Sequence, residues 1–84
     1  MVKASKIYER LSGAPSRPIP FRDFERCVVA FGFVHWRSQG SHRSFKHPQV
    51  TEVLTIQPNG KDAQPYQMRR FLAMVRAHDL RPDD

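Results

Sequence analysis

A stripe of four large apolar residues at helical spacing most constrains how this chain can fold. Phe21, Phe24, Val28 and Phe31 stand at positions i, i+3, i+7 and i+10, and charged residues occupy the opposite side. This spacing places the four side chains on one face of an α-helix. Gly32 follows directly, and glycine ends helices well because it adopts the left-handed conformation without steric cost. The pattern predicts an amphipathic helix that begins at Phe21, ends at Gly32 and must bury one face.

A second apolar stripe near the C-terminus predicts another long helix. Pro65 is suited to the first turn of a helix, and the apolar spacing then continues to about His78. The stripe consists of Met68, Phe71, Leu72 and Val75. A shorter helix is expected over residues 6–12, where Ile7 and Leu11 are one turn apart.

Between the two long helices, β-branched and aromatic residues alternate with turn residues, which indicates β-strands. The strands are expected over residues 33–38, 41–47 and 53–57. Gln39 and Gly40 form a tight turn between the first two strands. Pro48 breaks the second strand, and a loose loop is expected to lead to the third. The prediction is therefore an antiparallel three-stranded meander.

Alternation along a strand sorts its side chains onto two faces of the sheet. Phe45, Leu54 and Ile56 are expected to face the core. The other face then carries His42, Ser44, Lys46, Val53 and Thr55.

The predicted order α-β-β-β-α places the chain in the α+β class. Two helices with one apolar stripe each and a sheet with one apolar face form a two-layer sandwich, with both helices on the same side of the sheet. This is a dsRBD-like arrangement, that of the double-stranded RNA-binding domain, although a fold by itself assigns no activity. Residues 20–80 are expected to form this single domain, after an N-terminal extension of residues 1–19 and before a tail of residues 81–84.

The charge of the chain favours an anionic partner. The formal net charge is +6 and the sequence pI is near 10.3. Between Arg37 and Arg76, seven Lys or Arg residues stand against only two acidic residues, so the charge is concentrated there. RNA or another phosphate polymer is the expected ligand. With one cysteine and no apolar run long enough for a membrane span or a secretion signal, a cytoplasmic location is expected.

Three histidines, His35, His42 and His47, lie within 13 positions, and zinc accepts neutral imidazole as a ligand. Their spacing matches no zinc motif, and alternation sends His42 and His47 to opposite faces of one strand. No second cysteine completes a ligand set. We therefore expect neither a metal nor a cofactor, and we expect Cys27 to be a small buried hydrophobic residue.

Metal-free chemistry on RNA suits these residues better, because the 2′-hydroxyl of RNA can itself attack the adjacent phosphate. The protein then needs only to move protons and to stabilise charge. A positioned imidazole contributes about 10²–10⁴-fold to such a reaction, and His42 is the candidate for this role. Candidate RNA- or phosphate-binding residues are Lys46, Arg43, Ser44 and Arg37, and the turn that directs His42 consists of Gly40 and Ser41. By strict alternation Arg43 points to the other side of the strand and only borders the site.

The assembled residues resemble the HicA family of toxins from toxin–antitoxin pairs. The resemblance covers roughly residues 20–80. The matching residues are Gly32-Phe33, Gly40-Ser41-His42, Phe45, His47-Pro48, Gln57-Pro58, Gly60-Lys61 and Pro65-Tyr66-Gln67. Many members of the family have a second histidine directly after the first, where this chain has Arg43.

The resemblance implies a small endoribonuclease, an mRNA interferase, that cleaves messenger RNA and so arrests translation. It also implies that His42, the histidine of the Gly-Ser-His triplet, is catalytic without a metal. A cognate HicB antitoxin is the implied protein partner. Two alternatives remain open from the residues: a non-catalytic RNA-binding or translation-regulating module on the same fold, and a protein-interaction module whose basic face meets an acidic partner.

Overall fold

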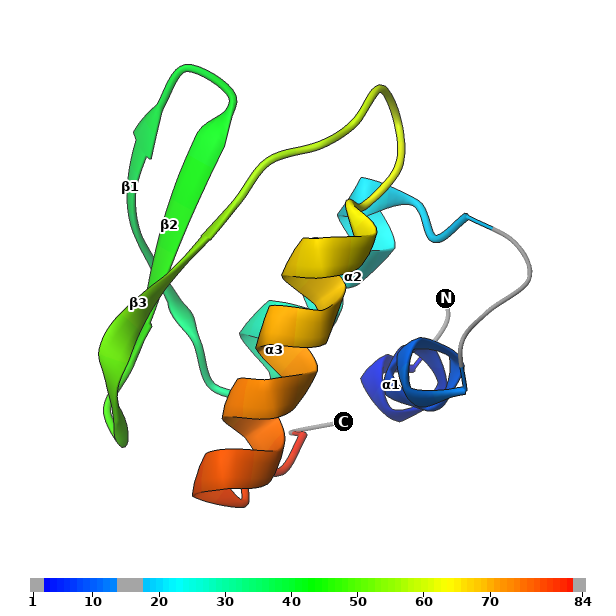
Figure 1. Ribbon diagram of the computed structural model, residues 1–84. Helices are drawn as coiled ribbons and strands as arrows, with labels where there is room; N and C mark the ends of the chain where they lie inside the picture. The colour runs from blue at the N-terminus through cyan, green and yellow to red at the C-terminus, as the bar shows by residue number, and fades with distance from the viewer. Residues whose placement is uncertain (1–2, 14–17, 83–84) are drawn as a thin grey trace.

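The structure is a computed structural model that describes residues 3–13 and 18–82 of the 84-residue chain. Parts of the expected N-terminal extension and tail, residues 1–2, 14–17 and 83–84, lie outside the described residues. The elements in chain order are α1 (Ala4–Ser12), α2 (Phe21–Ala30), β1 (Val34–Gln39), β2 (His42–His47), β3 (Val50–Ile56) and α3 (Pro65–His78), as Figure 1 shows.

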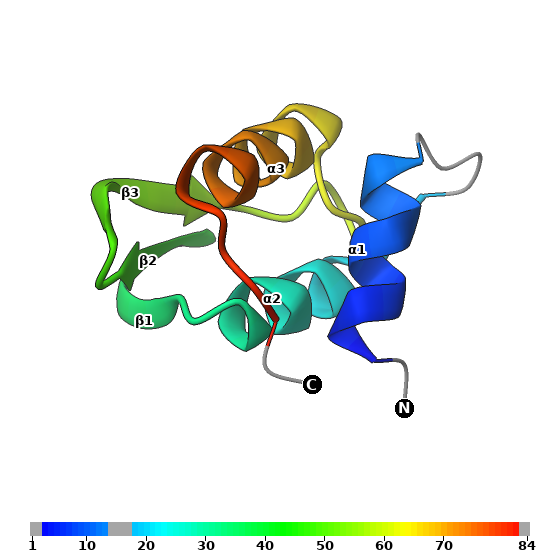
Figure 2. The ribbon, with the colours of Figure 1, turned by 90° about the horizontal axis from the view of Figure 1, so that it is seen from below.

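The three strands form one antiparallel sheet in the order β1-β2-β3, so β2 is paired on both sides. The helices α2 and α3 lie side by side against one face of this sheet, and α1 packs on the far side of the two helices (Figure 2). The predicted α+β fold with its meander and two covering helices is confirmed. One face of the sheet is left uncovered by the described elements.

The start of α2 lacks a side-chain cap, and the loop before α3 replaces it. Pro20 is the N-cap residue, and the Phe21 N–H donates a hydrogen bond of 2.8 Å to the carbonyl of Lys61. The Ala63 N–H donates in turn to the carbonyl of Ile19, also at 2.8 Å. The first bond satisfies a backbone N–H that the start of a helix otherwise leaves without a partner, and the second joins the loop before α3 to the residues before α2.

The end of α2 is set by Gly32, as predicted. Gly32 has a φ of +97°, and the next residue, Phe33, donates its N–H back to the carbonyl of Val28 at 3.4 Å. The left-handed conformation turns the chain from the helix into β1 within three residues.

The core lies between the sheet and the two long helices. Phe45, Leu54 and Ile56 are almost completely buried, which confirms the predicted inner face of the sheet. Phe71 of α3 stands at the centre of the aromatic core, with ring centroids 5.4–5.9 Å from those of its three neighbours. These neighbours are Phe24, Phe31 and Phe33. Cys27 is fully buried, as expected for a small hydrophobic residue.

The link between β2 and β3 differs from the prediction of a loose loop. The strand β3 begins at Val50, so only Pro48 and Gln49 separate the two strands. The Gln49 N–H donates to Nδ1 of His47 at 3.0 Å, which closes a tight turn, and Val50 is buried. Proline is tolerated here because it lies in the turn and not in the hydrogen-bonded ladder.

Gln67 ties the start of α3 to the end of β3. Its side chain is 3% exposed, and its Oε1 accepts a hydrogen bond of 3.0 Å from the Gln57 N–H. Gln64 adds a bond of 3.3 Å from its Nε2 to the Gln57 carbonyl. The side chains of Gln64 and Gln67 at the start of α3 therefore have a structural role.

Gly32→Ala is expected to destabilise the protein more than Gly60→Ala does. Both glycines have positive φ, but a Cβ at Gly32 would lie 2.8 Å from Nε2 of His47, whereas a Cβ at Gly60 meets nothing within 4 Å. We expect a loss of about 1 kcal/mol for Gly60→Ala from backbone strain alone, and at least about 2 kcal/mol for Gly32→Ala. Denaturant unfolding measures both. Equal losses would contradict the close contact with His47.

Candidate nucleic-acid interface

The uncovered face of the sheet, here called the open face, carries the polar residues that alternation along the strands predicted for it. Its residues are Val34, Trp36, Arg37, Gln39, His42, Ser44, Lys46, Val53 and Thr55. It contains two permanent cations and a histidine but, among the described residues, no carboxylate. Glu52 of β3 reaches the helix side instead, where its carboxylate lies 3.9 Å from the guanidinium of Arg70 on α3.

A β-bulge in β1 decides which of its side chains reach the open face. His35 is paired with Phe45, and Arg37 is paired with Ser44, so Trp36 is an extra residue on its strand. Without the bulge, alternation would send Trp36 and Arg37 to opposite faces. With it, Arg37 lies beside Ser44 on the open face and remains in contact with the Trp36 ring.

A shallow depression on the open face brings together three cross-strand pairs of the ladder. It is lined by Arg37, Gln39, His42, Ser44 and Thr55. His42 lies directly opposite Gln39, and Ser44 lies between Arg37 and Thr55. Ser44 and Thr55 share a hydrogen bond of 3.0 Å between their hydroxyl oxygens. The depression thus combines one imidazole, one guanidinium and three neutral polar groups.

His42 is the first residue of β2 and is exposed. Gly40 before it has a φ of +62°, which permits the tight turn through Ser41 that starts the strand at this point. Within the part of the chain that the structure describes, no residue forms a hydrogen bond with the His42 imidazole. Because the residue is also exposed, both ring nitrogens are available to a ligand.

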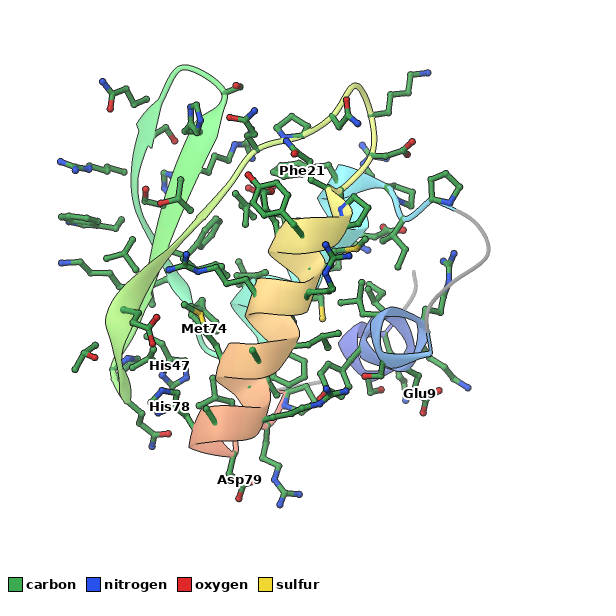
Figure 3. The ribbon with its side chains drawn as sticks, viewed as in Figure 1. Glu9, Phe21, His47, Met74, His78 and Asp79 are labelled. Atoms are coloured by element: carbon green, nitrogen blue, oxygen red, sulfur yellow. The ribbon has the colours of Figure 1, made fainter. Side chains whose placement is uncertain are left out.

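The other histidines of the sheet have structural partners on the helix side. The Nε2–H of His47 donates to the carbonyl of Phe31 at 3.1 Å, and its Nδ1 accepts from Gln49, so both nitrogens are occupied. Figure 3 shows His47 between the sheet and the C-terminal end of α3. His35 shares a hydrogen bond of 2.8 Å with Ser38. Among residues 3–13 and 18–82, no three His, Cys, Asp or Glu side chains gather as metal ligands would.

Lys46 lies on the same face as His42 but not beside it. Four residues along a strand correspond to about 13 Å, and Lys46 contacts Trp36 instead. Its ammonium Nζ lies 3.7 Å from the centre of the indole ring, and the guanidinium Cζ of Arg37 lies 4.4 Å from the same centre. The structure therefore groups Lys46 with Arg37 through an aromatic residue that the sequence analysis did not select.

Arg43 points to the helix side of the sheet, as strict alternation predicts. Its guanidinium forms an ion pair with the carboxylate of Glu25 on α2 and lies 5.8 Å from the centre of the Phe21 ring. Of the four predicted RNA-binding residues, Arg37, Ser44 and Lys46 thus share the open face, and Arg43 does not.

Trp36 is the residue that the sequence reasoning missed. It is the only tryptophan of the chain and stands between a histidine and an arginine. In the sequence it counted only as one of the aromatic residues that indicate a strand. A strand of alternating faces gives no reason to place Trp36 beside Arg37. The bulge supplies that reason, and it is visible only in the paired strands.

The fold and this face define a small α+β protein with an exposed histidine on a basic, uncovered sheet. Comparison with known families agrees with the resemblance noted in the sequence. The family described as the HicA toxin of bacterial toxin–antitoxin systems matches residues 21–76, two thirds of the chain. The protein belongs to the HicA toxin family. No curated protein and no solved structure matches the chain.

The matched region begins at the first residue of α2 and ends within α3, so it leaves out α1. It contains the whole sheet and the complete open face. In the described part of the chain, no helix has both the length and the apolar character needed to cross a membrane.

The Arg43–Glu25 pair is expected to add little stability. Arg43 is 47% exposed and Glu25 is 24% exposed, so water screens their attraction. A double-mutant cycle with Arg43→Ala and Glu25→Ala, read by denaturant unfolding, is expected to give a coupling energy of about 0.2–1 kcal/mol. A coupling well above this range would show that the pair holds α2 to the sheet.

Proposed function

We propose that the protein is a metal-independent endoribonuclease, the RNA-cleaving toxin of a toxin–antitoxin pair, with His42 as its catalytic acid or base. The observation that carries the proposal is the exposed imidazole of His42, which shares a depression with Arg37. Among the described residues, this face carries no carboxylate and the imidazole has no hydrogen-bond partner. Membership of the HicA toxin family supports the toxin role. The proposed substrate is messenger RNA.

The reaction uses the 2′-hydroxyl of the RNA as its nucleophile. The His42 imidazole removes the 2′-hydroxyl proton, and the 2′ oxygen forms a bond to the adjacent phosphorus. The bond from phosphorus to the 5′ oxygen breaks, and that oxygen takes up a proton from the imidazolium or from water. The products are a 2′,3′-cyclic phosphate and a free 5′-hydroxyl.

The neighbouring side chains support this step through charge and hydrogen bonding. The transition state carries extra negative charge on the phosphoryl oxygens, and a guanidinium stabilises such charge with several directed N–H groups. Arg37 lines the same depression as His42 and is assigned this role. The hydroxyls of Ser44 and Thr55, already paired at 3.0 Å, offer further contacts to phosphate or ribose.

His42→Ala is expected to abolish most of the cleavage of a messenger RNA in the presence of EDTA. Loss of a positioned acid or base lowers the rate by about 10²–10⁴-fold. The matched control is His78→Ala, which removes another exposed imidazole from the last turn of α3. Gel analysis of the RNA over time measures both variants against the unmodified protein.

Equal cleavage by the unmodified protein and His42→Ala would refute the catalytic role of His42. Intact RNA with every form of the protein, together with RNA binding that survives His42→Ala, would favour the non-catalytic RNA-binding module. In that module, phosphate contacts rather than the imidazole supply the affinity.

The proposed protein partner is an antitoxin of the HicB type, and the open face is its proposed binding surface. A toxin of a toxin–antitoxin system requires an inhibitor, and family membership places this chain among such toxins. Acidic groups laid over His42, Arg37 and Lys46 would complement the charge of the face and exclude RNA from it.

Binding of RNA and of the proposed HicB-type antitoxin is therefore expected to be mutually exclusive. The measurement is displacement of a labelled RNA from the His42→Ala variant by the purified antitoxin, which avoids cleavage during the titration. Stoichiometric displacement is expected, because both ligands occupy one face. A stable ternary complex with RNA would contradict inhibition through the open face.

A further inference from the structure

The open face holds an ordered group of cations that begins at Arg37 in the His42 depression and extends beyond it to Lys46. We propose that Trp36, Lys46 and Arg37, here called the tryptophan stack, bind the phosphate backbone of single-stranded RNA next to His42. The inference rests on the proposed function and specifies the form of its ligand. The proposed binding site is therefore longer than one nucleotide.

Burial in the core does not explain why a tryptophan occupies position 36. The side chain is 45% exposed, at a bulge in an edge strand, and so adds little to the core. Its contacts are instead with cations, at 3.7 Å for Lys46 and 4.4 Å for Arg37. Both distances lie within the range of cation–π attraction, which is strongest for tryptophan.

This packing prepares the two cations for a polyanion. Free lysine and arginine side chains lose much rotamer freedom when they bind a ligand, and a side chain already held against a ring loses less. The ring carries no charge, so it orders the cations without neutralising them. Arg43 gives the contrast, because its charge is paired with Glu25 on the other side of the sheet.

The position of the stack indicates the length and the form of the RNA. Arg37 belongs both to the stack and to the His42 depression, while Lys46 lies about 13 Å from His42 along β2. A ligand that touches both ends must therefore extend along the strand. Trp36 is 45% exposed, and an exposed aromatic side chain also suits an unpaired base, whereas the bases of a duplex are stacked on one another and are not free.

The test measures RNA affinity in the His42→Ala background, so that cleavage does not interfere. The probe is a fluorescently labelled oligouridine of about ten nucleotides, followed by polarisation. Trp36→Leu is expected to weaken binding about tenfold, and Trp36→Phe, which keeps an aromatic face, is expected to retain most of the affinity. Val29→Ala is the matched control, since Val29 is 53% exposed but lies on α2.

A double-mutant cycle separates the stack from a general structural effect. If Trp36 acts by holding Lys46, then Lys46→Met weakens binding strongly in the protein that retains Trp36 and only slightly in Trp36→Leu. Each lost phosphate contact also makes the slope of log affinity against log salt less negative by about 0.7. Additive effects of the two substitutions would overturn the proposed stack.

The only tryptophan of the chain provides a direct reading of the same site. Oligouridine is expected to change the emission of Trp36, and uridine monophosphate at equal nucleotide concentration is expected to leave it nearly unchanged. An equal response to both would overturn the extended site.

The outcomes distinguish this inference from the proposed function. Unchanged RNA affinity in a folded Trp36→Leu variant would overturn the stack, even if His42 still proves catalytic. Unchanged RNA affinity together with lost affinity for the antitoxin in Trp36→Leu would assign the stack to protein docking and would also overturn the inference. A protein that binds RNA through the stack but does not cleave it would instead refute only the catalytic proposal. Circular dichroism of each variant confirms that it is folded.

Discussion

The burial of Phe45 in the middle of β2 is the constraint on which the open face depends. The strand is paired on both sides, and Phe45 is 1% exposed beneath the helix layer. Because side chains alternate strictly along a strand, a shift of one residue would turn Phe45 to water and His42 toward the helices. The contact that builds the core therefore also directs the imidazole away from it.

Alternation along β2 also divides its polar residues between two different environments. Arg43 and His47 share the side of Phe45, where Glu25 and the carbonyl of Phe31 satisfy them. His42 and Lys46 leave the strand on the other side and meet no carboxylate there among the described residues. One short strand thus supplies both the packing of the domain and the cationic surface that we propose for RNA. Two residues outside the Gly-Ser-His triplet also serve packing, since Gly32 makes room for His47 and Gln67 holds β3 to α3.

Much of the fold could be predicted from the sequence because its local signals agree with one another. The helical stripes at 21–31 and 68–75, Gly32 as a helix end and Pro65 as a helix start each point to the observed element. The inner face of the sheet was likewise predictable from alternation in β2 and β3. The start of β3 was not, because the tight turn through Pro48 depends on a hydrogen bond to the side chain of His47.

The sequence by itself determined the composition of the candidate site: a histidine directly after a Gly-Ser turn, within a basic meander whose alternation separates His42 from Phe45. The tertiary structure decided which cations join that histidine. The bulge in β1 brings Arg37 to the depression and Trp36 to Lys46, and the α2 helix removes Arg43 through Glu25. Strand pairing and the approach of a distant helix are long-range events, and no local pattern of residues specifies the position of a bulge or the partner of a charge.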